Sequence, residues 1–163
     1  MKATAQGSAI VSAVRECPRD AEAPVVVAEV SGSIGHGVFA HAAIEPGAPI
    51  LRYGGVLRPS DLSDIDYAVR SSMRGFLLDA GLGGSTGALV NHSPVPNSRI
   101  VGGVVDGVEA SVIVAAERVI ARGEQICVDY GPGVIGRWPV VPILPGEELG
   151  FPHRLDLQAV TGE

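Results

Sequence analysis

The chain has 163 residues and a mass of 16.7 kDa, which is enough for one domain and too little for two of ordinary size. Hydrophobic residues make up 46% of it and the mean hydropathy is +0.30, so a substantial core can form. Twelve lysines and arginines face eighteen acidic residues, and the net charge of -6 has the wrong sign for a protein that binds phosphate backbones. We therefore expect no direct binding of nucleic acid, whereas a cationic protein or peptide is compatible with this charge.

Glycine and proline are abundant, at 22 and 12 residues, while only 18% of the chain is charged and 4% is aromatic. This composition argues against a helical bundle or a coiled coil. It favours a mainly β fold of short strands joined by tight turns.

The two cysteines, Cys17 and Cys127, lie far apart and have no second pair near them. This spacing indicates neither a zinc site nor a disulfide framework, so we expect no metal and a cytoplasmic location. The apolar stretch 101–121 is interrupted by charged residues such as Asp106 and Glu117. It is predicted to be protein core, and we expect no association with a membrane.

In chain order, residues 1–24 show little periodicity and are predicted to be an N-terminal extension. The β-branched run 25–30 predicts a strand, and the Gly-rich segment 31–37 predicts a flexible turn. Short strands are then predicted at 38–40 and 49–53. The domain is expected to occupy 25–133.

The second half begins with the segment that most favours a helix, 59–74, where Ser60 is a candidate N-cap and Leu62, Ile65 and Val69 are spaced by three and four residues. The strands predicted after it are 76–79, 100–105, 110–116 and 124–130. The middle two form a hairpin across Asp106-Gly107. The Pro-rich tail 134–163 contains Trp138 and is predicted to pack over the active site.

Four short segments follow one another along the chain in a particular order. They are GHGVFA at 35–40, YGG at 53–55, NHSPVPN at 91–97 and GEQICVDYG at 123–131. Taken together they resemble the SET-domain family of S-adenosylmethionine-dependent lysine methyltransferases, over most of the chain from Val25 to Gly131. The resemblance implies a β-clip fold of small curved sheets with one or two short helices, in which the NHS segment threads beneath the loop after the DY strand to form a pseudoknot.

The resemblance also implies the chemistry and its residues. Tyr130 matches the catalytic tyrosine, and Tyr53 is similar to the YxG tyrosine that lines the lysine channel. Methyl transfer from a sulfonium to an amine is an in-line displacement, so catalysis depends mostly on positioning. A lysine with a pKa of about 10.4 must first lose a proton, which a narrow apolar channel favours.

The cofactor site implied by the resemblance binds S-adenosylmethionine. Asn91 and His92 match the family's cofactor pair, and Tyr130 lies beside the same site. The segment of Gly35, His36 and Gly37 is expected to approach the cofactor through its backbone, because glycine permits close contact; the His36 side chain receives no role of its own.

Three further residues are interpreted as scaffold: Asn97 closes its loop, Glu124 bonds a turn and Asp129 supports the pseudoknot.

The chain departs from the family pattern at several positions. Ala88-Leu89 replaces the common Arg-Phe, and Pro94 replaces the cysteine that joins a zinc cluster in several subfamilies. The tail has no cysteine, so a minimal, zinc-free domain without pre-SET or post-SET clusters is expected. Val128 stands where a larger aromatic residue often limits the number of methyl groups added.

The acceptor is therefore left open. A basic, lysine-containing protein or peptide is the leading substrate, and a small-molecule amine is the alternative. A third hypothesis is a SET-like module that binds a partner without catalysis, against which the joint presence of Tyr130, Asn91 and His92 weighs. A homodimer is left open as an oligomeric state.

Overall fold

A computed structural model of the chain describes residues 21–31, 35–61, 68–70, 74–81, 85–105 and 108–130. Its strands are β1 (Val25–Ser31), β2 (Gly35–Ala40), β3 (Pro49–Tyr53), β4 (Val56–Pro59), β5 (Ala68–Arg70), β6 (Phe76–Asp79), β7 (Asn91–His92), β8 (Ser98–Val105), β9 (Val108–Ala116) and β10 (Cys127–Val128). A short 3-10 helix, η1 (Thr86–Leu89), precedes β7. The described part of the chain is thus mainly β, as the composition predicts.

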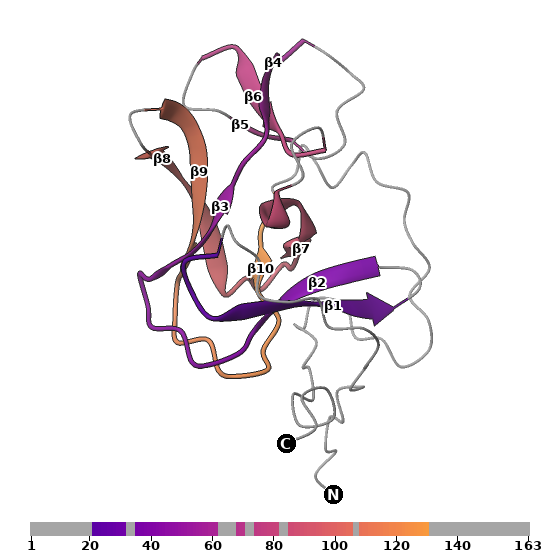
Figure 1. Cartoon of the computed structure of the whole chain (residues 1–163), viewed down its shortest axis with the longest axis vertical. Helices are drawn as coiled ribbons and strands as arrows, with labels where there is room; N and C mark the ends of the chain where they lie inside the picture. Colours follow the sequence, from indigo (N-terminus) through magenta and orange to yellow (C-terminus); the bar gives the residue numbers. More distant parts are fainter. Residues whose placement is uncertain are drawn as a thin grey trace, which may run out of the picture.

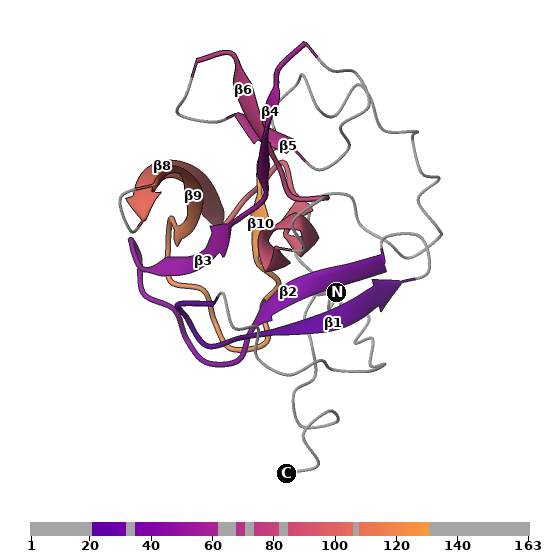
Figure 2. The ribbon, with the colours of Figure 1, turned by 45° about the horizontal axis from the view of Figure 1, so that its top comes forward.

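The strands form four small sheets, ordered β1-β2, β3-β9-β8, β4-β6-β5 and β7-β10. In Figure 1 the β7-β10 pair and η1 lie between the other three sheets, and the second view in Figure 2 shows the same arrangement. Segments distant in sequence therefore meet at the centre of the molecule.

The β1-β2 pair shows why an unbroken apolar run forms a strand here. Val25 and Val27 face the main core cluster, while Val26, Ala28 and Val30 belong to a second buried cluster with Phe39. Because both faces of β1 are buried, its sequence does not alternate with polar residues. The predicted strand 25–30 is confirmed.

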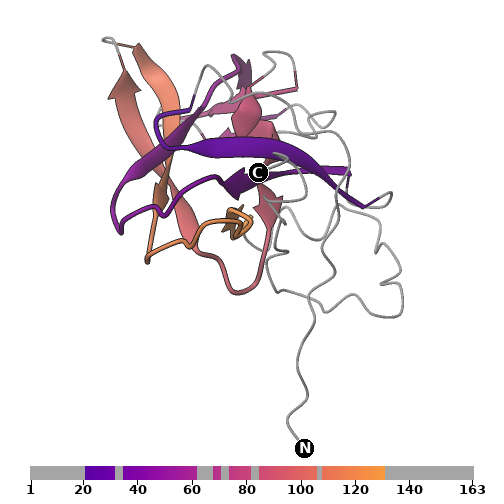
Figure 3. The same cartoon turned by 60° about the horizontal axis from the view of Figure 1, so that its bottom comes forward.

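The main core cluster joins the β1-β2, β3-β9-β8 and β7-β10 sheets, whereas the β4-β6-β5 sheet contributes to a separate cluster around Tyr53. The largest fully buried members of the main core cluster include Ile50, Leu51, Ile120 and Ile126. Figure 3 brings forward the segment that follows β9 and leads to β10, drawn in orange beside β1 and β2. This segment is bonded to β2, since Ile126 N donates to Val38 O at 2.8 Å.

The predicted hairpin of the apolar stretch is confirmed: β8 pairs antiparallel with β9, and β9 pairs in turn with β3. Its turn at Asp106-Gly107 lies outside the described residues. Within the part of the chain that the structure describes, no helix is long and apolar enough to cross a membrane.

The predicted helix over 59–74 is wrong where the structure describes this region. Ser60 directly follows the end of β4, and its N–H donates to Gly75 O at 2.9 Å. The later part of the range forms β5. Leu62 and Ile65 lie outside the described residues.

The physical reason is strand pairing, which overrides a weak helical periodicity. Val69 lies opposite Leu78 in the antiparallel β5-β6 pair and packs against the cluster that Leu78 forms with Tyr53 and Ala80. A β-branched residue that is half-buried in a sheet gains more from this pairing than from a short isolated helix.

The predicted strand over 124–130 is shorter than expected. Only Cys127–Val128 form a ladder, while Gln125 makes an isolated bridge with Phe39. The predicted extension 1–24 is described only from Ala21, which bridges to Leu51. The tail 134–163 lies outside the described residues, so its predicted place over the site stays a prediction.

Candidate active site

The centre of the site is the pairing of β7 with β10. The two strands run parallel, with Asn91 opposite Cys127 and His92 opposite Val128. Ser93 N continues the ladder by donating to Val128 O at 3.0 Å. This pairing brings the NHS and DY segments together, as a pseudoknot requires; the loop after Tyr130 lies outside the described residues.

Asn97 fastens this pairing from within the protein. Its side chain is fully buried, and its Nδ2 donates to Gln125 O at 2.7 Å and to Glu124 Oε1 at 3.3 Å. Its Oδ1 accepts a hydrogen bond from Cys127 N at 2.9 Å. One amide therefore binds the backbone of the segment on both sides of Ile126.

Glu124 extends the same network to the surface. It forms an ion pair with Arg118 and accepts a hydrogen bond from Ala121 N at 2.9 Å. Burial by itself raises the pKa of the Glu124 carboxyl, but the hydrogen bonds from Arg118, Ala121 and Asn97 outweigh burial and lower the pKa below its ordinary value. Glu124 is thus a charged structural group, in agreement with its predicted role.

Tyr130 is held at both ends by the segment that contains β7. Its N–H donates to His92 Nδ1 at 3.1 Å, and its hydroxyl donates to Val90 O at 2.6 Å. The two rings also meet, with centroids 5.4 Å apart and planes tilted by 45°. Nδ1 of the His92 ring thus serves as the acceptor for the Tyr130 N–H. Asp129 lies nearby, with Oδ1 3.7 Å from Nδ1.

Asn91 connects β7 to the Gly35-His36-Gly37 segment of β2. Its Nδ2 donates to His36 O at 3.0 Å. A Cβ placed on Gly37 would lie 2.6 Å from Gln125 Nε2 and 3.1 Å from Asn91 Nδ2. A side chain at position 37 would displace these neighbouring side chains, which is a reason for glycine other than the cofactor approach predicted from sequence.

Gly35 differs from Gly37 in its backbone conformation and in the space beside it. It has a φ of +78°, a conformation that favours glycine, and a Cβ at this position would meet nothing within 4 Å. Of the two glycines, Gly35 is the one that leaves space beside the backbone.

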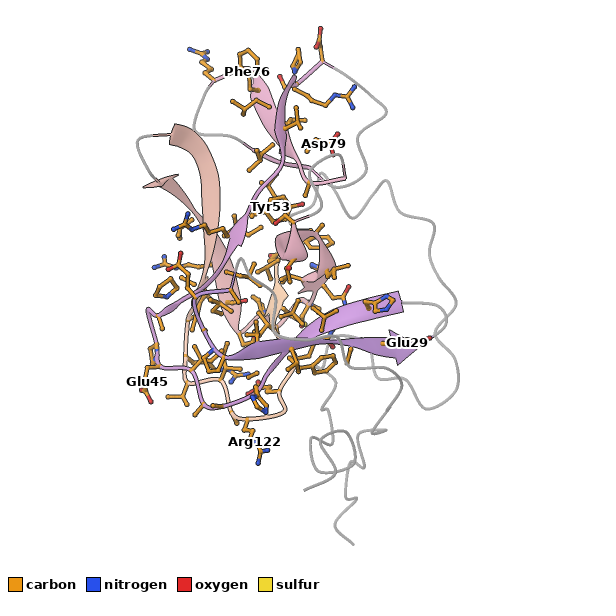
Figure 4. The ribbon with its side chains drawn as sticks, in the orientation of Figure 1. Glu29, Glu45, Tyr53, Phe76, Asp79 and Arg122 are labelled. Carbon is orange, nitrogen blue, oxygen red and sulfur yellow. The ribbon has the colours of Figure 1, made fainter. Side chains whose placement is uncertain are left out.

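Tyr53 lies at the end of β3 in an apolar cluster with Leu78 and Ala80. Figure 4 shows it beside η1 at the centre of the molecule. A Cβ on Gly87 would lie 2.7 Å from Tyr53 Cδ2 and 3.0 Å from its Cα, so the tyrosine packs directly on the backbone of η1. The surroundings of Tyr53 are thus apolar, as the predicted lysine channel would require.

The two tyrosines are connected through η1. Tyr53 packs on Gly87, Tyr130 bonds to Val90 O, and Val90 N donates to Gly87 O at 3.2 Å. Three residues of a 3-10 helix advance by about 6 Å. The two predicted catalytic residues thus contact neighbouring points of one short backbone segment.

The residues present fit S-adenosylmethionine. The amide of Asn91 is bonded to the His36 carbonyl beside the open backbone at Gly35, and its neighbour His92 is bonded to Tyr130. The bonds described above use Asn91 Nδ2 and His92 Nδ1, and neither involves Asn91 Oδ1 or His92 Nε2. Such a mixture of amide, backbone and aromatic groups suits a ligand with an amino acid part and a heteroaromatic ring.

A metal is not indicated by this donor set. Among the described residues, no group of three or more His, Cys, Asp or Glu side chains could hold a metal ion. Cys127 is a free, buried thiol whose pKa is raised to about 12, first by burial and then by the charge of Glu124. It therefore stays protonated at neutral pH and acts neither as a nucleophile nor as a metal ligand.

Sequence reasoning missed two residues that organise the site, Ser85 and Gln125. The Gln125 side chain fills the space beside Gly37, and the Ser85 hydroxyl binds the backbone on both sides of Tyr53. Ser85 lies in a Gly- and Ser-rich stretch that gives no sign of a long-range contact. The signal for Gln125 was its place inside GEQICVDYG, between Glu124 and Asp129, which both received a role.

Comparison with known proteins adds independent support. The model of the SET domain family matches residues 35–131 of this chain. An Arabidopsis thaliana protein named histone H3-lysine(4) N-trimethyltransferase is 34% identical over 114 residues, which cover 61% of this chain and 10% of that protein. The chain thus corresponds to about a tenth of the length of this curated relative.

Solved structures show the same fold. A Plasmodium falciparum protein named as a candidate histone methyltransferase superposes with a TM-score of 0.54 at 22% identity, covering 68% of this chain and 96% of that one. A chain of an active polycomb repressive complex 2 in the basal state gives a TM-score of 0.58 at 25% identity, covering 67% of this chain and 15% of that one. With the family match spanning more than half of its length, the chain belongs to the SET domain family, a family of protein lysine methyltransferases.

Proposed function

We propose that the protein transfers a methyl group from S-adenosylmethionine to the side-chain amine of a lysine in a protein or peptide. The observation that carries this proposal is the double attachment of Tyr130 to the segment that contains β7, through His92 Nδ1 and Val90 O. It holds the predicted catalytic hydroxyl one residue away from the predicted cofactor pair Asn91 and His92.

The cofactor supplies an electrophilic methyl group on a positively charged sulfur. The protein's part is to hold the acceptor nitrogen in line with it and to keep water away. The Tyr130 hydroxyl is fixed by Val90 O and supplies a polar oxygen beside the reacting groups, while the Tyr53 cluster supplies the apolar wall. No covalent intermediate with the protein is needed, and the lysine proton leaves to solvent before attack.

Two observations support a basic protein or peptide as the acceptor. The net charge of -6 attracts a cationic segment, and the Arabidopsis thaliana relative is named as a histone H3-lysine(4) N-trimethyltransferase. The alternative acceptor, a small-molecule amine, was left open partly because Val128 is small where a larger aromatic residue often stands. Its side chain is fully buried in the main core cluster, so neighbouring core residues already surround it.

A methyl-labelling experiment tests the proposal. The protein is incubated with S-adenosylmethionine labelled in the methyl group and with a histone mixture, and the products are separated by mass. We expect label on lysine residues of protein. Label only in low-mass material from a cell extract would favour the small-molecule acceptor, and no calorimetric signal with the cofactor would favour the non-catalytic module. Cytoplasmic location and a homodimer stay predictions that this experiment does not address.

A further inference from the structure

Ser85 has an unusual set of hydrogen bonds for a residue at the start of a short helical turn. Its Oγ accepts from Gly87 N at 3.1 Å, which is the ordinary capping bond of η1. It also accepts from Gly54 N at 2.9 Å and donates to Arg52 O at 3.1 Å. The last two bonds join η1 to the end of β3, more than thirty residues earlier in the chain.

These bonds enclose Tyr53 from three directions. Arg52 and Gly54 are its two neighbours in the chain, and both are bonded to the same oxygen. Gly87, the third bonded residue, is the one on which the Tyr53 ring packs. A serine hydroxyl offers one donor and two acceptor sites, so all of its capacity is used here.

We propose that Ser85 is a positioning residue that fixes Tyr53 relative to Tyr130 for methyl transfer. The proposal rests on the proposed function, because it assumes that Tyr53 lines the channel of the acceptor amine. The Ser85 oxygen sets the distance between β3 and η1, and η1 continues through Val90 to the Tyr130 hydroxyl. A single side chain thereby sets the spacing of the two tyrosines, although it touches neither reacting group.

Removal of the Ser85 hydroxyl loosens the contact between β3 and η1, on the side of the site where the acceptor is expected to enter. In S85A the N–H groups of Gly54 and Gly87 lose their acceptor, and the backbone around Tyr53 can shift against η1. The bonds that hold Asn91, His92 and Tyr130 do not involve Ser85. Catalysis should therefore suffer while cofactor affinity is preserved.

The kinetic test compares S85A, S85T and I44V. Ile44 is buried and its backbone pairs with Ile120, away from the Ser85 bonds, so I44V lowers stability without altering the contacts of Tyr53. We expect S85A to lower kcat/KM for a lysine peptide by about tenfold, since small misplacements of reacting groups are costly. The Kd for S-adenosylmethionine should stay within about twofold, and S85T, which retains the hydroxyl, should recover most of the activity. Equal losses in S85A and I44V at matched thermal stability would overturn the proposal.

A second measurement is independent of activity. Amide hydrogen exchange at Gly54 and Gly87 is compared with exchange at Ile126, whose N–H is bonded to Val38 O in another part of the fold. In S85A we expect the first two amides to exchange about tenfold faster relative to Ile126, because they have lost a hydrogen bond. Unchanged relative exchange would refute the positioning role even if S85T failed to fold. Absence of methyl transfer by the wild-type protein would count against the proposed function, and the exchange data would then still decide whether Ser85 holds the backbone around Tyr53 against η1.

Discussion

Two regions of the molecule each hold one tyrosine of the candidate site, and they hold it in different ways. Around β7 and β10, Tyr130 depends on polar groups, above all the buried amide of Asn97 and the half-buried imidazole of His92. Around η1 and the β4-β6-β5 sheet, Tyr53 depends on apolar packing, on contact with Gly87 and on the Ser85 hydroxyl. Figure 4 shows how far the second region extends, with Phe76 at its outer end and Glu45 and Arg122 at the opposite end of the molecule.

Because of this difference, we expect substitutions in the two regions to affect the protein in different ways. Buried polar groups are bonded to specific atoms, so removal of one leaves its partners without a bond in a site that water cannot reach. Apolar contacts adjust more gradually, because neighbouring side chains can shift to fill part of the space. Stability should depend mainly on the first region, and fine adjustment of the acceptor side on the second.

The largest effect is expected from Asn97→Ala. The substitution leaves Gln125 O and Cys127 N buried without their hydrogen-bond partner. Each such group costs about 1–3 kcal/mol, so the free energy of unfolding should fall by roughly 3 kcal/mol or more. The measurement is the free energy of unfolding by urea. Ser98→Ala is the matched control, because it removes one buried bond to Cys127 O and should cost about 1 kcal/mol. Equal losses in the two variants would contradict the central role of Asn97.

The second prediction separates the two tyrosines. Tyr130→Phe removes the hydroxyl that donates to Val90 O and should lower kcat by about 100-fold, because a fixed polar group at the reacting centre is lost. The cofactor Kd should remain nearly unchanged, as measured by calorimetry. Tyr53→Phe keeps the ring on Gly87 and should act mainly on the KM of the acceptor, by less than about tenfold. A Tyr130→Phe enzyme with normal turnover would remove Tyr130 from its assigned role.

A third prediction concerns the close packing of Tyr53. Gly87→Ala places a methyl group 2.7 Å from Tyr53 Cδ2 and 3.0 Å from its Cα, and such overpacking should cost about 1–3 kcal/mol. Gly102→Ala is the matched control, because a Cβ at that position in β8 meets nothing within 4 Å. Thermal unfolding measures both. If the two variants unfold at the same temperature, Tyr53 is not fixed by contact with η1.

The smallest effect is the pH dependence of the Glu124 network. Hydrogen bonds from Arg118, Ala121 and Asn97 outweigh burial and lower the pKa of the Glu124 carboxyl, so the charged form stabilises the fold at neutral pH. This contribution is lost as the pH falls through the lowered pKa, below the ordinary value of about 4.3 for glutamate. The free energies of unfolding of wild type and Glu124→Gln should therefore differ at pH 7 and converge in acid. A constant difference over this range would show that the charge of Glu124 contributes nothing.

The same contrast explains which features could be predicted from sequence. Around β7 and β10 the specific polar residues stand in a fixed order, so Asn97, His92 and Tyr130 could be assigned to neighbouring places before the structure was known. In the outer sheet Val69 fits a helix and a strand equally well, and only its pairing with Leu78 decides between them.

Ser85 and Gly37 show a second limit. The Ser85 hydroxyl acts on Arg52 and Gly54, and nothing in its local sequence indicates so distant a partner. Glycine at position 37 was correctly singled out, but the groups that exclude a side chain there are Gln125, Val30 and Asn91, which only the folded chain brings together. Side-chain bonds across the fold are thus the least predictable part of the site.

The parallel pairing of β7 with β10 has a consequence for synthesis of the chain. During translation, residues up to the end of β9 can form three of the four sheets, because every strand of those sheets precedes Ala116. The partner of β7 and the attached phenol arrive last, so a nascent or truncated polypeptide that ends before Cys127 has no assembled reaction centre. The candidate site is therefore complete only after synthesis has continued beyond Tyr130.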